Sequence, residues 1–165
     1  MSILISESGS EPITTADVKA WAKVENSDED TLVLSLITSC RKEIEAYTKN
    51  VLLAQTWQTE CISDKGQTVF YSPRIAVNGA TVTIDDVAYT DFALDKSKGR
   101  VRLNTQYYGD EVILIEWTMA TALSSLAPLT QALKDLVTYR FYNRGSYDLP
   151  DNVKTILNMY RIFNL

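Results

Sequence analysis

Two hydrophobic patterns follow one another along the chain. Between residues 31 and 50, apolar residues recur at spacings of three and four, which places them on one face of a helix. These residues are Val33, Leu36, Ile37, Cys40, Ile44 and Tyr47. From Gln55 onward, polar and apolar residues alternate, which is typical of a strand with one buried face. The pattern predicts a long amphipathic helix followed directly by β structure.

Capping residues and prolines indicate three further helices. A short helix follows Thr14 and Thr15, whose hydroxyl groups can accept hydrogen bonds from the free N–H groups of a first turn. The acidic segment 26–30 supplies a cap and negative charge at the start of the long helix. Pro128 suits the first turn of a third helix, and Pro150 precedes a last one.

The segments between the second and third helices are expected to be β-strands. Asp85-Asp86 separates two alternating segments, so we expect a hairpin turn there. The expected strands are 52–61, 67–71, 80–84, 87–89, 92–95, 100–103 and 111–118. The predicted fold class is α+β and mainly helical, with a four-helix core of two N-terminal and two C-terminal helices and a central antiparallel β insertion.

The length of 165 residues predicts a single domain, residues 1–165. Within it, residues 1–50 hold the N-terminal helices, 51–120 the β insertion and 121–165 the C-terminal helices. Met1 is not followed by the basic segment and long apolar segment of a secretory signal, and the apolar runs are shorter than the ~20 residues of a membrane span. We therefore expect no membrane partner, and synthesis in the cytoplasm of the producing cell.

Acidic charge is concentrated in the first part of the chain. Residues 1–120 hold 18 acidic and 11 basic residues, whereas 121–165 hold three and five, which gives the formal net charge of −5. A chain with this balance is poorly suited to a sequence-independent clamp on DNA, which needs a basic stripe.

The residue content leaves little material for catalysis. The chain has no histidine, which excludes Ser-His-Asp and Cys-His catalysis, and it contains no phosphate-binding glycine motif. Cys40 and Cys61 are too few for a zinc site or a disulfide scaffold, and they favour a reducing compartment. The acidic groups at 28–30 and 85–86 are explained by a helix cap and a turn, with metal binding as the alternative. We expect no enzyme activity, no cofactor and no metal.

Aromatic and basic residues interleave near the C-terminus, in Tyr139-Arg140-Phe141-Tyr142 with Arg144 and in Tyr160-Arg161-Ile162-Phe163. The rings can fill the core, stack on nucleic-acid bases, or form a protein interface, where Tyr, Phe and Arg are enriched. Trp21, on a short helix, can lie exposed at a subunit seam.

Several segments together resemble one known family. They are TTADVKAWAKV from Thr14, the D-E-D at 28–30, RKEIEAYTK from Arg41, AQTW from Ala54, APLTQALK from Ala127, YNRG from Tyr142, Leu149-Pro150 and Met159-Tyr160-Arg161. In this order they resemble the head–tail connector proteins (adaptor or head-completion proteins) of long-tailed phages. Arg74–Val77 and Gly99–Leu103 resemble the β insertion of that family in their general residue pattern, without a diagnostic motif. Where the family usually has a Gly-rich turn, this chain has Met119-Ala120-Thr121-Ala122-Leu123.

The resemblance implies a noncatalytic virion protein at the head–tail junction. Such proteins form a ring, commonly of about twelve copies, on the portal protein, and they receive a stopper or tail-completion protein on the other rim. DNA would pass through without specific binding. The alternative is a small nucleic-acid-binding or regulatory module that uses the C-terminal basic and aromatic helices.

The candidate site residues follow from this interpretation. Candidates for docking on the portal are the apolar and charged residues at the chain end, Tyr160, Arg161, Ile162, Phe163 and Leu165. Candidates for the subunit interface are Trp21, Arg140, Tyr142 and Arg144. Asp85 and Asp86 are the acidic candidates for the lumen of the ring.

Overall fold

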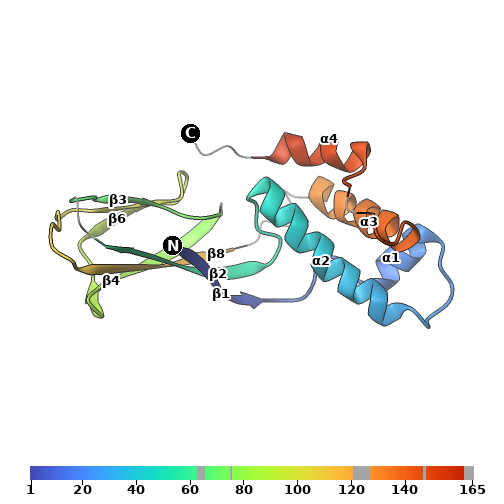
Figure 1. The fold of residues 1–165 in the computed structure, drawn as a ribbon, viewed down its shortest axis with the longest axis horizontal. Coiled ribbons are helices and arrows are strands. Elements are labelled where there is room, and N and C mark those ends of the chain that lie inside the picture. The colour runs from blue at the N-terminus through green and yellow to red at the C-terminus, as the bar shows by residue number, and fades with distance from the viewer. Residues whose placement is uncertain (63–65, 75, 121–126, 147, 162–165) are drawn as a thin grey trace. The chain divides into compact units, whose positions relative to one another are not determined.

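The computed structural model describes residues 1–62, 66–74, 76–120, 127–146 and 148–161 (Figure 1). The chain divides into two compact units. The β unit consists of Met1–Gly9 and Leu53–Thr121, and the helical unit consists of Ser10–Leu52 and Ala122–Leu165. The single domain expected for the whole chain stays a prediction.

The predicted mainly helical fold is wrong. Among the described residues, 35% are helical and 31% are in strands, so the fold is α+β with two antiparallel sheets. The correction is largest at the N-terminus, where residues 2–8 form a strand in a region assigned to helices. The three consecutive apolar residues Ile3, Leu4 and Ile5 do not follow a helical period, and β-branched isoleucines favour the extended chain.

Four helices form the helical unit: α1 (Thr15–Ala22), α2 (Asp30–Thr48), α3 (Ala127–Tyr142) and α4 (Asp151–Tyr160). Thr14 caps α1, since its Oγ1 accepts from the Asp17 N–H at 3.1 Å while the Asp17 carboxylate accepts from the Thr14 N–H at 2.8 Å. The side-chain cap expected from residues 26–30 is not formed at the start of α2. Glu29 occupies the N-cap position, but its side chain makes no capping hydrogen bond. Its neighbour Asp30 instead pairs with Lys19, at 2.8 Å.

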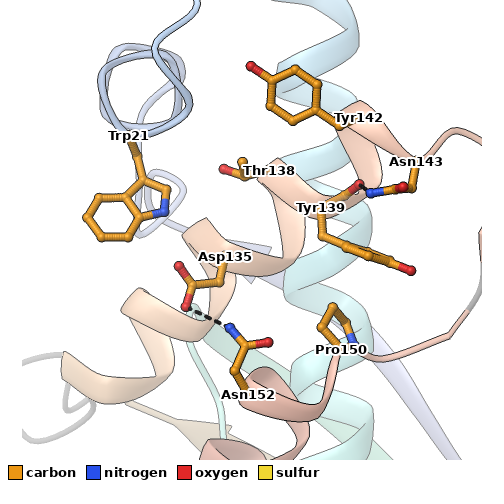
Figure 2. A pocket seen from close by; sticks show the side chains of 8 residues that line it. All are labelled: Trp21, Asp135, Thr138, Tyr139, Tyr142, Asn143, Pro150 and Asn152. Carbon is orange, nitrogen blue, oxygen red and sulfur yellow. Dashed lines mark hydrogen bonds between the residues drawn. The ribbon is translucent and has the colours of Figure 1, made fainter.

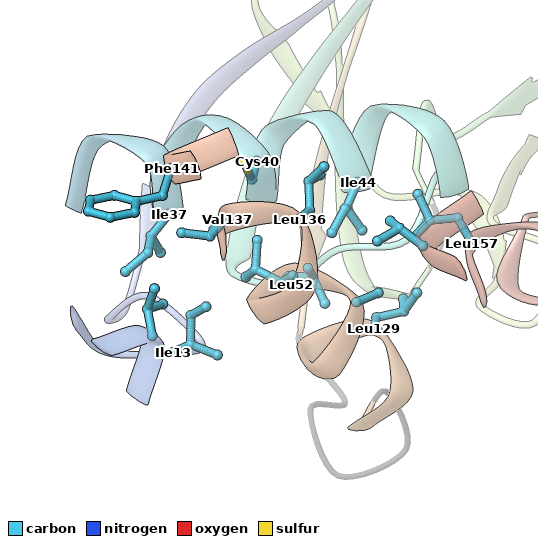
Figure 3. Packing of buried hydrophobic residues seen from close by; sticks show 14 of the residues in the cluster. Ile13, Ile37, Cys40, Ile44, Leu52, Leu129, Leu136, Val137, Phe141 and Leu157 are labelled. Carbon is cyan, nitrogen blue, oxygen red and sulfur yellow. The ribbon is translucent and has the colours of Figure 1, made fainter. Parts of the chain in front are cut away.

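The helical core is built on the apolar stripe of α2. Val33, Ile37, Cys40 and Ile44 are buried, and Leu36 and Tyr47 pack against them. Side chains from the other three helices and the adjoining loops complete the cluster, including Ile13, Val18, Leu52, Leu129, Leu133, Leu136, Val137, Phe141, Val153 and Leu157 (Figure 3). Burial of a leucine or isoleucine side chain contributes roughly 1.5–3 kcal/mol, so this shared cluster stabilises the four helices as one body.

Eight strands form the β unit. They are β1 (Ser2–Ser8), β2 (Ala54–Ile62), β3 (Val69–Tyr71), β4 (Val77–Ile84), β5 (Val87–Tyr89), β6 (Phe92–Asp95), β7 (Arg100–Leu103) and β8 (Val112–Met119). A five-stranded sheet has the order β1-β2-β8-β4-β5, and a three-stranded sheet has the order β3-β7-β6. Every pairing is antiparallel.

The central strand β8 shows why this sheet forms. It pairs with β2 on one side and with β4 on the other. Alternate residues Ile113, Ile115, Trp117 and Met119 are buried, as the period of two requires for a sheet with one covered face. The indole N–H of the fully buried Trp117 donates to the Thr59 hydroxyl at 3.0 Å, which satisfies its polar atom within the core.

Candidate interaction surfaces

A groove with a volume of about 340 Å³ lies on the helical unit (Figure 2). The side chains that line it are Trp21 of α1, Asp135, Thr138, Tyr139 and Tyr142 of α3, Asn143, Pro150, and Asn152 of α4. Two predicted interface residues, Trp21 and Tyr142, therefore border one feature. Both rings are largely exposed, at 54% and 60%.

Hydrogen bonds hold the walls of this groove in place. The Tyr142 hydroxyl donates to the Ala22 carbonyl at the end of α1, at 2.8 Å. On α3, Asp135 accepts from Gln131 at 3.1 Å and from Asn152 at 3.5 Å. Aromatic faces beside a carboxylate can receive an apolar or a cationic side chain of another protein.

The other two interface candidates have partners within the helical unit. The Arg140 guanidinium contacts both carboxylate oxygens of Glu43 on α2, at 3.0 and 3.2 Å, and donates to the Ser146 carbonyl at 2.6 Å. Arg144 pairs with Glu29, and its guanidinium lies over the Phe141 ring at 5.7 Å. Arg140 is mostly buried, whereas Arg144 remains 63% exposed. Arg140 thus joins α3 to α2, and Arg144 is the more accessible of the two.

The end of α4 contacts α2. The Asn50 side chain donates to the Tyr160 carbonyl at 2.8 Å, and the Arg161 guanidinium lies 4.8 Å from the centre of the Tyr47 ring. The Tyr160 side chain packs against the helical core. The remaining docking candidates, Ile162, Phe163 and Leu165, lie outside the described residues, as does the 121–123 part of the segment that replaces the Gly-rich turn.

Asp85 and Asp86 form the two-residue turn between β4 and β5, as the sequence predicted. Both have positive φ, 48° and 65°, which is the conformation of a tight hairpin turn and is tolerated by aspartate. The Asp85 carboxylate accepts from the Val112 N–H at 2.9 Å, so it stabilises the start of β8. The Asp86 side chain is exposed. Their position in a lumen stays a prediction.

Sequence reasoning missed a buried ionic network in the helical unit. Arg41 of α2 is 1% exposed, and its guanidinium contacts Glu11 at 2.8 Å and Glu45 at 2.9 Å. The Glu45 carboxylate also accepts from the Leu52 N–H at 2.6 Å, and Glu11 accepts from the Thr38 hydroxyl at 2.8 Å. Only the i, i+4 spacing of Arg41 and Glu45 was visible in advance, and it is also typical of a solvent-exposed helix pair.

The thiols and carboxylates of the described residues are the side chains considered for metal binding and nucleophilic chemistry. Within these residues, no group of three or more Cys, Asp or Glu side chains is arranged to hold a metal ion. Burial raises the pKa of the Cys40 thiol to about 12, and it also raises the pKa of the Cys61 thiol. A thiol with a raised pKa is a weak nucleophile. Over the same part of the chain, the structure contains no helix that is long and apolar enough to span a membrane.

Exposed aromatic rings beside a carboxylate, as on the helical unit, are typical of the surfaces of structural interaction proteins. The chain belongs to the head completion protein family, because the family model described as "Head completion protein" matches residues 11–147. This family consists of structural virion proteins and is not an enzyme class. The predicted family and the predicted location in the virion at the head–tail junction are thereby confirmed.

Solved structures share the fold at low sequence identity. A chain in the neck of an empty gene transfer agent particle, determined with C6 symmetry, has a TM-score of 0.78 and 15% identity, covering 100% of this chain and 97% of that one. A chain in the native gene transfer agent virion has a TM-score of 0.77 with the same identity and coverage. A chain in the native neck, with C12 symmetry, has a TM-score of 0.68 and 17% identity, covering 99% and 97%. No curated protein matches the sequence.

Proposed function

We propose that this chain is the adaptor subunit that forms a ring of about twelve copies on the portal protein and links the DNA-filled head to the tail. The observation that carries the proposal is the family match over residues 11–147, which includes parts of both the helical and the β unit. The fold shared with chains from particle necks of C6 and C12 symmetry supports it. The opposite rim of the ring receives the stopper or tail-completion protein.

Within this proposal, Trp21 and Tyr142 contribute to contacts between neighbouring subunits, together with Arg144 at their edge. The support is their exposure beside the groove on the helical unit, where rigid aromatic rings can be buried at low entropic cost. Arg140 acts by holding α3 on α2 through Glu43, rather than by touching the neighbour directly.

The segment that follows Pro150 docks on the portal. Met159 is 77% exposed at the end of α4, and Arg161 is exposed over Tyr47. The apolar residues Ile162, Phe163 and Leu165 extend this surface along the sequence. An apolar chain end beside an arginine suits a partner groove with a carboxylate, since a guanidinium can bind a carboxylate through two hydrogen bonds.

DNA passes through the ring without specific binding. The net charge of −5, and the turn at Asp85 and Asp86, support a lumen that repels phosphate. The alternative of a nucleic-acid-binding module is disfavoured, because Arg140 and Arg144, the centre of its predicted surface, are paired with Glu43 and Glu29.

The test is assembly with the portal protein encoded by the same genome. Negative-stain images of the purified chain, alone and mixed with portal, should show rings seated on the portal. A variant that lacks residues 162–165 should keep the melting temperature of the wild type but fail to join portal-bearing heads. A chain that stays monomeric beside the portal and binds duplex DNA more tightly than about micromolar would instead support the regulatory alternative.

A further inference from the structure

The first strand of the β unit presents unprotected apolar residues at a sheet edge. β1 ends the five-stranded sheet, and its described pairing is with β2 on one side. Ile3, Leu4 and Ile5 are exposed to 43%, 39% and 50%. Because successive side chains in a strand point to opposite faces, this exposure involves both faces of the strand. Burial of all three in a further contact would remove a continuous apolar stripe from water.

Edge strands of soluble proteins usually carry devices that prevent pairing, such as lysine, proline or inward-pointing charge. The stretch from Ser2 to Ser6 contains none of these residues. The register shifts between Leu4 and Ser6, but this irregularity leaves the apolar Ile5 in solvent. The Ser2–Ser6 part of β1 therefore lacks the usual barriers to pairing on its outer side, and Glu7, the charged residue of this strand, accepts from the Gln55 side chain of β2 at 3.2 Å.

The same sheet has a second open edge. β5 lies at the opposite end and is paired, within the described part of the chain, with β4 alone. Its Val87 is 68% exposed, and Ala88 is exposed as well. Four successive antiparallel pairings separate β1 from β5, so the two strands run in the same direction. A rotation between neighbours in a ring of many copies is small and nearly preserves that direction, so β1 of one copy can lie parallel to β5 of the next.

We propose that β1 binds the β5 edge of a second copy of this chain by parallel strand addition. The inference rests on the proposed ring, which needs two different surfaces that fit each other on every subunit. The two edges of one sheet are such a pair. Backbone N–H and C=O groups supply the affinity, and Ile3, Leu4, Ile5 and Val87 supply the apolar burial. Repetition of the contact would continue the five-stranded sheet from subunit to subunit.

Cross-linking of variants with one exposed cysteine tests the contact directly. In a Cys61→Ser background, Ser6→Cys marks β1 and Ala88→Cys marks β5; both positions are exposed, whereas Cys40 is buried. A bis-maleimide added to the concentrated mixture should give at least about tenfold more covalent dimer than either variant alone, because only the mixture juxtaposes the two edges. Tyr71→Cys on β3 is the matched control, since Tyr71 is 60% exposed on an edge strand of the other sheet.

The inference is overturned if Ser6→Cys alone, or Ser6→Cys mixed with Tyr71→Cys, gives as much dimer as the mixture of Ser6→Cys and Ala88→Cys. The absence of dimer from every mixture also overturns it. A second measurement uses charge. Ile3→Lys with Ile5→Lys should weaken self-association at least about tenfold in sedimentation velocity, whereas Leu34→Lys with Ile62→Lys, at positions 52% and 60% exposed, should not. Unchanged association of the β1 variant contradicts the proposal.

The outcomes also separate this inference from the proposed function. Rings of the mixed Ser6→Cys and Ala88→Cys variants that form on the portal without this cross-link would reject the strand pairing and leave the adaptor role intact. A cross-link between these edges in a protein that never joins the portal would reject the adaptor role and leave the pairing intact. If the lysine variants fail to fold, as judged by circular dichroism, the cross-linking experiment decides.

Discussion

Arg41 and Glu11 form an ion pair across 30 residues of sequence, with 2.8 Å between the guanidinium Nε and the carboxylate. Glu11 follows the point where the chain enters the helical unit, and Leu52, bound by Glu45, is the last residue before the chain leaves it. One buried arginine and its two carboxylates therefore fix both ends of the Ser10–Leu52 segment to α2.

Loss of Arg41 should destabilise the helical unit strongly. Arg41→Met leaves the Glu45 carboxylate, which is 3% exposed, without its guanidinium partner. The breaking of a buried pair from one side costs about 3–5 kcal/mol of unfolding free energy. Guanidinium denaturation should measure this loss, with Arg100→Met as the control. Arg100 and its partner Asp95 are both about one-third exposed, and its loss should cost below about 1 kcal/mol. Equal effects of the two substitutions would contradict the assigned role.

The cap of α1 should make stability depend on pH in acid. The hydrogen bonds from the Thr14 backbone and hydroxyl hold the pKa of Asp17 below its usual value of 3.8. A lowered pKa in the folded state stabilises the protein above the unfolded value, and this contribution is lost as the pH falls through the folded value. Asp17→Asn should therefore remove part of the decrease in melting temperature below pH 4. Persistence of the full decrease would show that other carboxylates cause it.

Thr14→Ala tests the same cap at neutral pH. The substitution removes the acceptor for the Asp17 N–H and should lower the melting temperature by about 2–4 °C. Thr130→Ala serves as the comparison, because its hydroxyl donates to the Ala127 carbonyl within α3 and does not satisfy a free N–H group. A Thr14→Ala protein as stable as the wild type would show that water replaces the hydroxyl without cost.

The two thiols should differ in reactivity. A pKa of about 12 leaves roughly one Cys40 thiol in ten thousand as thiolate at pH 8, and its side chain is also buried. Iodoacetamide should therefore modify the half-buried Cys61 slowly and Cys40 more slowly still, whereas both should react in guanidinium. Mass spectrometry of the labelled peptides measures the order in which the two cysteines are modified. Faster labelling of Cys40 in the folded protein would contradict its place in the core.

Substitution of Arg140 should affect mainly the stability of the fold, whereas substitution of Trp21 should affect mainly the assembly of the ring. Arg140→Met removes the pair with Glu43 and the bond to the Ser146 carbonyl, so it should cost about 1–3 kcal/mol of folding free energy. Trp21→Ala changes an exposed ring and should leave the unfolding free energy within about 0.5 kcal/mol, but weaken ring formation. Thermal melts and sedimentation velocity measure the two effects. A Trp21→Ala protein that assembles normally would show that Trp21 does not contribute to the subunit interface.

Periodicity predicted the elements whose patterns are unambiguous. The seven expected strands match β2 to β8 with shifts of a few residues at their ends, and the buried apolar residues of α2 all belong to its predicted apolar stripe. β1 was missed because a run of three apolar residues has neither a helical nor an alternating period. Its pairing with β2 depends on a long-range contact that no local pattern encodes.

The candidate surfaces were less predictable than the elements. Trp21 and Tyr142 could be chosen as exposed rings, but not as neighbours on one groove, because they lie on α1 and α3. The interleaving of rings with arginines indicated a binding surface, yet Arg140 and Arg144 pair with Glu43 and Glu29, about a hundred residues away. Which charges compensate one another is decided by tertiary packing, and the sequence alone does not contain that information in a readable form.

The interleaved path of the chain has a consequence for its synthesis on the ribosome. Ser2 pairs with Thr59, 57 residues later, and Tyr47 bonds Asn158 across 111 residues. The five-stranded sheet can close once β8 has emerged, whereas α1 and α2 must wait for α3 and α4. The apolar face of α2 therefore stays exposed during most of translation, and β1 is the first strand made but waits for β2. We expect the nascent chain to need protection from aggregation over this interval, and the β unit to mature first.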